Sequence, residues 1–136
     1  MTKKYLDELT YKIIGCCINV HSALGPGLLE SVYHKCLEEE FRHQKIKFQS
    51  ELIVPVVYRN LEINAQLRAD FYIENCLVVE LKAVDGIQPV HEAQLLTYLK
   101  LLESPKGILI NFNCVNIFRQ GQKTFVTEKY RNLDDE

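Results

Sequence analysis

Charged residues interrupt two short apolar segments in the middle of the chain, and this feature constrains the fold most strongly. Residues 68–84 have the sequence RADFYIENCLVVELKAV, in which Asp70, Glu80 and Lys82 stand among Phe, Leu and Val. Both segments have the composition of β-strands, and burying an unpaired charge in a sheet costs several kcal/mol. The three side chains therefore need a partner, an ion or a wet cleft.

The register of these two strands decides which side chains share a face. A two-residue loop at Glu74-Asn75 would mix charged and apolar side chains on both faces. A three-residue loop or a bulge shifts the pairing by one residue and leaves one face wholly apolar. The apolar pairs of that register are Phe71 with Val79, Ile73 with Leu77, and Ala69 with Leu81. Its other face carries Asp70 opposite Glu80, Arg68 opposite Lys82, and Tyr72 opposite Val78.

Asp70 and Glu80 form a candidate metal site in the shifted register. Two carboxylates ~5 Å apart across a ladder repel each other unless a cation joins them. Mg²⁺ and Mn²⁺ prefer such oxygen ligands together with waters and substrate phosphates. Lys82 shares the face and can orient a water or stabilise charge on a phosphate. The pattern leaves one structural alternative open, a salt-bridge ladder in which Arg68 and Lys82 neutralise the two carboxylates.

Hydrophobic periodicity predicts a single α/β domain over residues 1–136, with a mixed central sheet flanked by helices. The expected helices cover about residues 4–24, 28–44 and 90–103. The expected strands are 51–58, 61–73, 76–84, 107–112, 115–119 and 123–130. The first three strands form an antiparallel meander in this interpretation, and Gly25-Pro26-Gly27 ends the first helix.

Composition excludes several classes of protein. The net charge of −2 argues against coating nucleic acid by bulk electrostatics. The best candidate for a local basic patch is RHQKIK, residues 42–47, which a solvated helix end explains equally well. The five cysteines lack the spacing of a zinc site. No apolar run approaches the ~18 residues of a membrane span, and the first residues lack the apolar core of a signal peptide. We expect a cytoplasmic protein without a membrane segment.

Polar residues on two predicted helices extend the candidate site. Glu30 and Tyr33 share a face of the second helix at i, i+3, although a Glu in a first turn is usually a helix-dipole partner. Gln94 and Tyr98 are i, i+4 on the third helix, with His91 one turn earlier. Considered alone, the polar set on the third helix is equally compatible with a solvated helix face.

These segments together resemble a known family. GLLESVY matches the GxxExxY signature at Gly27, Glu30 and Tyr33. The resemblance continues through RADF, VELKAV, QLLTYL and GILINF, which is nearly the whole chain. GxxExxY proteins are assigned to the PD-(D/E)XK nuclease superfamily, which has a restriction-endonuclease-like fold.

The resemblance implies a role for each motif residue. Asp70 corresponds to the motif aspartate, and Glu80 with Lys82 to the ExK pair. Glu30 corresponds to an additional helix carboxylate, and Gln94 with Tyr98 to the QxxxY motif of RecB-like exonucleases. One departure is Ala69, which stands where the motif proline would be.

Metal-dependent phosphodiester hydrolysis is the activity that the resemblance implies. In this hypothesis Asp70, Glu80 and the Leu81 carbonyl hold Mg²⁺ or Mn²⁺, and Glu30 binds the ion through water or completes a second site. Lys82 positions the attacking water, and Gln94 holds Lys82 or the nucleic-acid substrate. Two alternatives remain: a non-catalytic interaction module that retains the fold, and a phosphohydrolase acting on small phosphate esters. A homodimer is compatible with each.

Overall fold

Two helices joined by a tight corner begin the chain. The computed structural model describes residues 1–136 and places α1 at Lys3–Leu24 and α2 at Glu30–His43. The Thr2 hydroxyl caps α1 by accepting a hydrogen bond from the Tyr5 N–H. Gly25 and Gly27 have φ of 72° and 98°, a conformation that glycine adopts without steric cost, and they turn the chain into α2.

A five-stranded mixed sheet forms the centre of the molecule, with strand order β1-β4-β5-β6-β7. Only the β5–β6 pair is parallel, and α3 connects these two strands. The remaining elements are β1 Phe48–Ile53, β2 Val56–Tyr58, β3 Leu61–Ile63, β4 Arg68–Ile73, β5 Leu77–Lys82, α3 Pro89–Leu101, β6 Lys106–Asn111, the π-helix η1 Ile117–Gly121, β7 Gln122–Val126 and α4 Glu128–Arg131.

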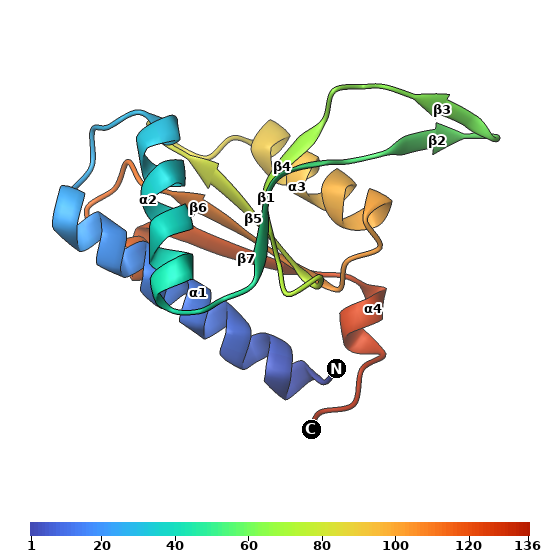
Figure 1. The fold of residues 1–136 in the computed structure, drawn as a ribbon, viewed down its shortest axis with the longest axis horizontal. Helices are drawn as coiled ribbons and strands as arrows, with labels where there is room; N and C mark the ends of the chain where they lie inside the picture. Colours follow the sequence, from blue (N-terminus) through green and yellow to red (C-terminus); the bar gives the residue numbers. More distant parts are fainter.

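Helices cover both faces of this sheet, as Figure 1 shows, with α1 and α2 on one face and α3 on the other. The first core cluster packs α1 and α2 against residues such as Phe71, Val79 and Leu81. The second core cluster packs α3 against Ala69, Val78 and other residues. The predicted α/β class, with a mixed sheet flanked by helices, is confirmed.

Three predicted strands are wrong in part. Segments 51–58 and 61–73 are each broken, so that β2 and β3 leave the sheet as a separate hairpin. Pro55 lies two residues after the end of β1 and has no N–H to donate to a ladder. Segment 123–130 ends as a strand at Val126 and continues as α4. The predicted antiparallel arrangement is confirmed for β1, β4 and β5.

Segment 115–119 is not a strand but leads into the π-helix η1. The Asn116 side chain accepts a hydrogen bond from the Arg119 N–H. The Gln120 side chain accepts from the N–H groups of Val115 and Asn116. These local hydrogen bonds compete with strand pairing, and an alternating pattern does not reveal them.

The described chain holds no disulfide and no helix with the length and apolar character needed to span a bilayer. All five cysteines are free, and Cys16, Cys17 and Cys76 are buried.

Candidate active site

The β4–β5 hairpin has the shifted register through a three-residue loop at Glu74, Asn75 and Cys76. The observed pairs are Phe71 with Val79, Tyr72 with Val78, and Ile73 with Leu77. The ladder stops there, and the predicted pairing of Ala69 with Leu81 is wrong. Ala69 packs in the second core cluster, whereas Leu81 packs in the first.

The side chains of Asp70 and Glu80 take the place of the missing ladder bonds. The Asp70 N–H donates to Glu80 Oε1 at 2.9 Å, and the Leu81 N–H donates to Asp70 Oδ2 at 2.8 Å. On the other side of β4, pairing with β1 skips Glu51 and Asp70 between the pairs Ser50–Phe71 and Leu52–Ala69. Both ladders of β4 are therefore interrupted at Asp70, and its carboxyl group lies beside that of Glu80.

Burial makes this carboxyl pair electrostatically unfavourable. Glu80 is only 4% exposed. Burial, followed by the negative charge of Asp70, raises the pKa of Glu80 to about 9, while Lys82 acts in the opposite direction. Glu80 thus retains a proton near neutral pH in the absence of a cation.

The structural alternative of a salt-bridge ladder is not formed. Arg68 is exposed and makes no ion pair, and Lys82 lies within salt-bridge distance of neither carboxylate. The one ion-pair contact of Asp70 is with His34, whose Nδ1 lies 3.6 Å from Asp70 Oδ1. Neither of the two strand cations, Arg68 and Lys82, therefore pairs directly with Asp70 or Glu80.

A pocket of about 380 Å³ opens between α2 and the interrupted strand. All of its lining residues are polar, namely Glu30, Ser31, His34, Lys35, Glu38, Glu51 and Asp70. Helix α2 supplies Glu30, His34 and Glu38 at i, i+4 and i+8, which places them on one helix face. Glu51 has φ of 52°, a left-handed conformation inside a strand, at the position that the β1–β4 ladder skips.

Glu30 is half-buried in this pocket together with Asp70. Burial and then the charge of Asp70 raise the pKa of Glu30, while Lys82 and His34 lower it. These mutual effects place Glu30 within electrostatic range of Asp70 and Lys82.

Tyr33 does not line the pocket, although it lies on the same helix turn as Glu30. The side chain is fully buried, and its ring stacks on Phe112 with centroids 4.3 Å apart. Its hydroxyl donates to the Gly25 carbonyl and accepts from the Leu28 N–H. Tyr33 therefore fixes the corner that leads into α2, which in turn positions Glu30.

Sequence reasoning missed His34, which connects α2 to the strands. Its Nε2 lies 2.7 Å from Ser50 Oγ, and the Ser50 hydroxyl donates to Glu38 at 2.6 Å. The ring also stacks on Phe71, with centroids 4.3 Å apart. A hydrogen bond with Asp70 raises the pKa of His34, although burial opposes the shift. The four-residue spacing of Glu30, His34 and Glu38 was the sequence signal that could have placed His34 on the same helix face as Glu30.

Helix α3 packs Tyr98 in the same core cluster as Ala69, the residue before Asp70. Tyr98 is buried in the second core cluster, and burial followed by the charges of Glu80 and Asp70 raises its pKa. Gln94 is half-buried and forms no hydrogen bond with Lys82. The expectation that Gln94 holds Lys82 or the substrate stays a prediction.

The residues present fit a hard divalent cation that takes only a few ligands from the protein and the rest from water. No group of three or more His, Cys, Asp or Glu side chains is arranged to hold a metal ion. Asp70 and Glu80 nevertheless supply two converging carboxyl groups whose repulsion a cation would relieve. Mg²⁺ is commonly bound through one or two carboxylates and several waters, so the donor set is chemically adequate.

Comparisons with known proteins agree with this geometry. Residues 7–125 match the family model of the PD-(D/E)XK nuclease superfamily. No curated protein sequence matches the chain. The crystal structure of SSO0001 is similar in fold, with a TM-score of 0.53 and 23% sequence identity. The alignment covers 71% of this chain and 50% of SSO0001, so the chain spans about half the length of that protein.

Proposed function

Because the chain belongs to the PD-(D/E)XK nuclease superfamily, we propose that it is a metal-dependent nuclease that hydrolyses phosphodiester bonds in nucleic acid. The observation that carries the proposal is the convergence of Asp70 and Glu80 at a break in two β-ladders, without an ion pair to a strand cation. Without a cation such a buried pair is destabilising, because Glu80 must either retain a proton or carry its charge beside Asp70 in a desolvated site.

Each residue has a role in this proposal. Asp70, Glu80 and the Leu81 carbonyl would hold Mg²⁺ or Mn²⁺, and Glu30 would act through a bound water or at a second ion. The bound ion would supply Lewis-acid stabilisation of the phosphodiester oxygens. Lys82 would orient the attacking water, and Gln94 would position the substrate.

The charge of the pocket makes substrate binding depend on the metal. Four carboxylate side chains line the pocket, and only Lys35 and His34 offset them. Phosphate groups would therefore be repelled from the site until a divalent cation binds.

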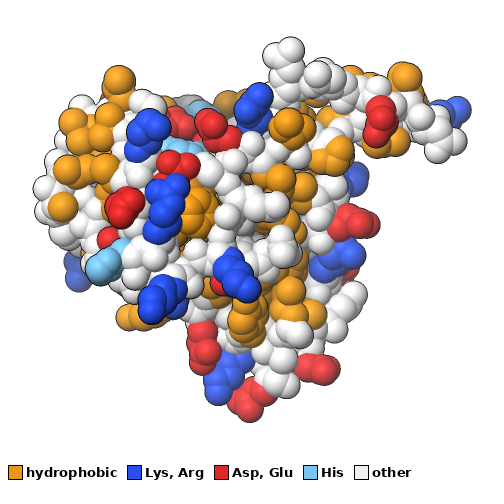
Figure 2. All heavy atoms as spheres, viewed as in Figure 1, with side chains coloured by type: hydrophobic (Ala, Val, Ile, Leu, Met, Phe, Trp, Pro, Cys, Tyr) orange, Lys and Arg blue, Asp and Glu red, His pale blue; other side chains and the backbone are white.

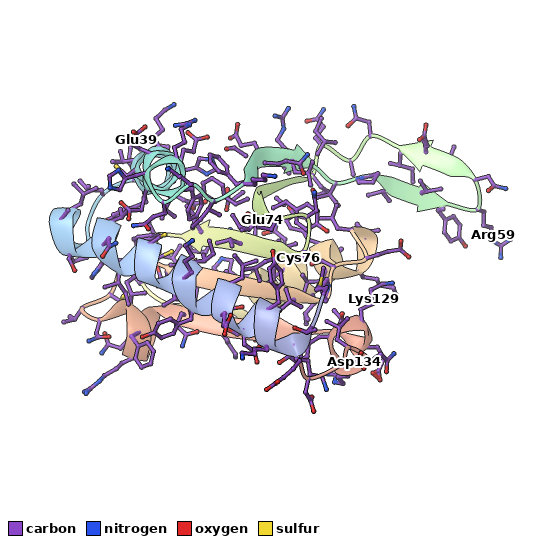
Figure 3. All side chains as sticks on the ribbon, turned by 60° about the horizontal axis from the view of Figure 1, so that its bottom comes forward. Glu39, Arg59, Glu74, Cys76, Lys129 and Asp134 are labelled. Atoms are coloured by element: carbon purple, nitrogen blue, oxygen red, sulfur yellow. The ribbon has the colours of Figure 1, made fainter.

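Metal binding can be measured directly as thermal stabilisation. Titration with Mg²⁺ or Mn²⁺ should raise the melting temperature of the wild-type protein, and Asp70→Asn should abolish the rise. Asp134→Asn is a matched control, because Asp134 is an exposed carboxylate near the C-terminus (Figure 3). A wild-type melting temperature that millimolar metal leaves unchanged would contradict the proposal.

A substrate screen then separates the candidate functions. Single- and double-stranded DNA, RNA and small phosphate esters should be tested with metal, comparing the wild type with Glu80→Ala. Gln94→Ala should weaken the binding and positioning of the substrate more than it weakens metal affinity. The acidic pocket favours one competing function, a non-catalytic interaction module. Metal binding without turnover of any substrate would support that module, and cleavage of esters alone would support a phosphohydrolase.

A further inference from the structure

A network of four polar side chains links α2 to β1 and β4 at the wall of the pocket. Glu38 Oε2 accepts a hydrogen bond from the Ser50 hydroxyl at 2.6 Å, and Ser50 Oγ lies 2.7 Å from His34 Nε2. On the other side of the same ring, His34 Nδ1 lies 3.6 Å from Asp70 Oδ1. Figure 2 shows acidic, basic and histidine side chains gathered over α2. His34 therefore joins Asp70 to the helix that carries Glu30.

The donors in this network follow from its hydrogen count. The Ser50 hydroxyl has one hydrogen and donates it to Glu38, so Ser50 Oγ must accept from His34 Nε2. The other ring nitrogen, Nδ1, faces Asp70. Both ring nitrogens thus have protein partners, and neither is free to bind a metal ion. In agreement, no group of three or more His, Cys, Asp or Glu side chains is arranged as a metal site.

Packing fixes the plane of the His34 ring. The ring stacks on Phe71, with centroids 4.3 Å apart and an angle of 19° between the planes. Phe71 is fully buried and meets the rings of Phe41 and Phe48 edge-on, at centroid distances of 5.0 Å and 5.8 Å. A ring held between a buried aromatic face and Ser50 has little freedom to turn, so Nδ1 stays beside Asp70.

Asp70 depends on side-chain contacts for its orientation, because neither neighbouring ladder pairs at this residue. Its Oδ2 accepts from the Leu81 N–H of β5 at 2.8 Å, and its Oδ1 faces His34 of α2. The carboxyl group is thus held from two elements. Loss of the His34 contact would leave it attached to β5 alone and freer to rotate.

We propose that His34 is a positioning residue of the metal site, which holds the Asp70 carboxylate beside Glu80 and fixes the spacing between α2 and β4. This role rests on the metal binding proposed above. Ser50 and Glu38 act through His34, because they hold its Nε2 and so set the direction of Nδ1. Removal of a side chain that holds a metal ligand typically weakens metal affinity or activity by about 10- to 100-fold.

Calorimetric titration of the full chain with Mn²⁺ tests this role. His34→Phe keeps a ring to stack on Phe71 but removes both nitrogens, so it should weaken Mn²⁺ binding by about tenfold or more. Ser50→Ala removes the partner of Nε2 without touching Asp70, and it should weaken binding several-fold. His43→Phe is the matched control, because His43 is an exposed residue in the last turn of α2, and its Mn²⁺ affinity should equal that of the wild type.

Two further measurements separate positioning from a general loss of stability. Because Ser50 acts through His34, the double variant His34→Phe/Ser50→Ala should bind Mn²⁺ as His34→Phe alone does. Thermal melts of the metal-free variants record stability separately, and a purely structural role would lower the melting temperatures while leaving the Mn²⁺ dissociation constant unchanged.

NMR of the metal-free protein tests the network even if His34→Phe does not fold. The His34 Nε2–H should exchange slowly with solvent in the wild type, because it donates to Ser50, and Ser50→Ala should remove this protection. A rapidly exchanging Nε2–H in the wild type would overturn the network and the role built on it.

The contrary results of the titration have distinct meanings. Variants at His34 and Ser50 that bind Mn²⁺ as tightly as the wild type would overturn the positioning role and leave the proposed function standing. Loss of binding in His34→Phe with no change in Ser50→Ala would make His34 a direct ligand, which also overturns the role, as would equal weakening by His43→Phe. A wild type that binds no Mn²⁺ would overturn the proposed function and this role together.

Discussion

Replacement of Glu80 by Gln should stabilise the metal-free protein, increasingly so as the pH rises. The folded state raises the pKa of Glu80 from 4.5 to about 9, through burial first and the charge of Asp70 second. Between these values the folded state retains a proton that the unfolded state has released. The Glu80 contribution to stability is therefore fully present below pH 4.5 and is lost as the pH rises toward 9.

The size of the effect follows from the shift. Each pKa unit corresponds to about 1.4 kcal/mol, so the wild type should lose about 3 kcal/mol relative to Glu80→Gln between about pH 6 and pH 8. The Gln amide oxygen can still accept from the Asp70 N–H, and its NH₂ can donate to the Asp70 carboxylate as the protonated acid does. The substitution thus removes the ionisation with little change in hydrogen bonding.

Urea denaturation at several pH values measures this difference. The stability gap between Glu80→Gln and the wild type should widen steadily with pH in metal-free buffer. Glu62→Gln, which replaces an exposed carboxylate on β3, should follow the wild type. Saturating Mg²⁺ should narrow the gap, because the cation takes over the role of the proton. A gap that stays constant from pH 6 to pH 8 would refute the assignment of a buried, proton-retaining carboxyl pair.

Three further outcomes are expected. Lys82→Ala should remove nuclease turnover while leaving the Mg²⁺-induced rise in melting temperature largely intact, since a cation is not a metal ligand; thermal melts and a cleavage assay check this. Tyr33→Phe should cost about 1 kcal/mol in urea denaturation, because the Gly25 carbonyl loses its donor from the hydroxyl. Nucleic-acid binding, measured by fluorescence anisotropy, should require a divalent metal in the wild type and be weak with a chelator, because the pocket is acidic.

Local signals predicted much of the fold. The amphipathic periods of α1 and α2 and the glycine corner between them locate both helices to within about two residues. The apolar pairs on one sheet face fix the Phe71–Val79 register, because the register of a two-residue loop would mix charged and apolar side chains on both faces. Segment 115–119 was misassigned because hydrogen bonds of Asn116 and Gln120 satisfy its backbone locally.

The site depended more on tertiary structure. A single histidine on a helix has no distinctive pattern, so His34 became apparent only when α2 packed beside β4 and Ser50 came within hydrogen-bond distance. Tyr33 shares a helix turn with Glu30, yet the corner at Gly25 captures its hydroxyl. Spacing along α2 therefore identified residues near the site without distinguishing those that face the pocket from those that shape it.

Strand register brought Asp70 and Glu80 together in the sequence analysis, but it did not predict the interruption of β4 at Asp70. In a regular strand Ala69 and Phe71 would share a face, but they pack in opposite core clusters. The strand therefore changes orientation at Asp70, where pairing with both neighbouring strands is skipped. Two ladder positions left open would expose unpaired N–H groups, and the carboxyl oxygens of Asp70 and Glu80 accept two of them. Asp70 and Glu80 therefore replace the missing ladder hydrogen bonds and also place two carboxyl groups at the break. The distortion of the sheet and the acidic character of the site thus depend on the same two side chains.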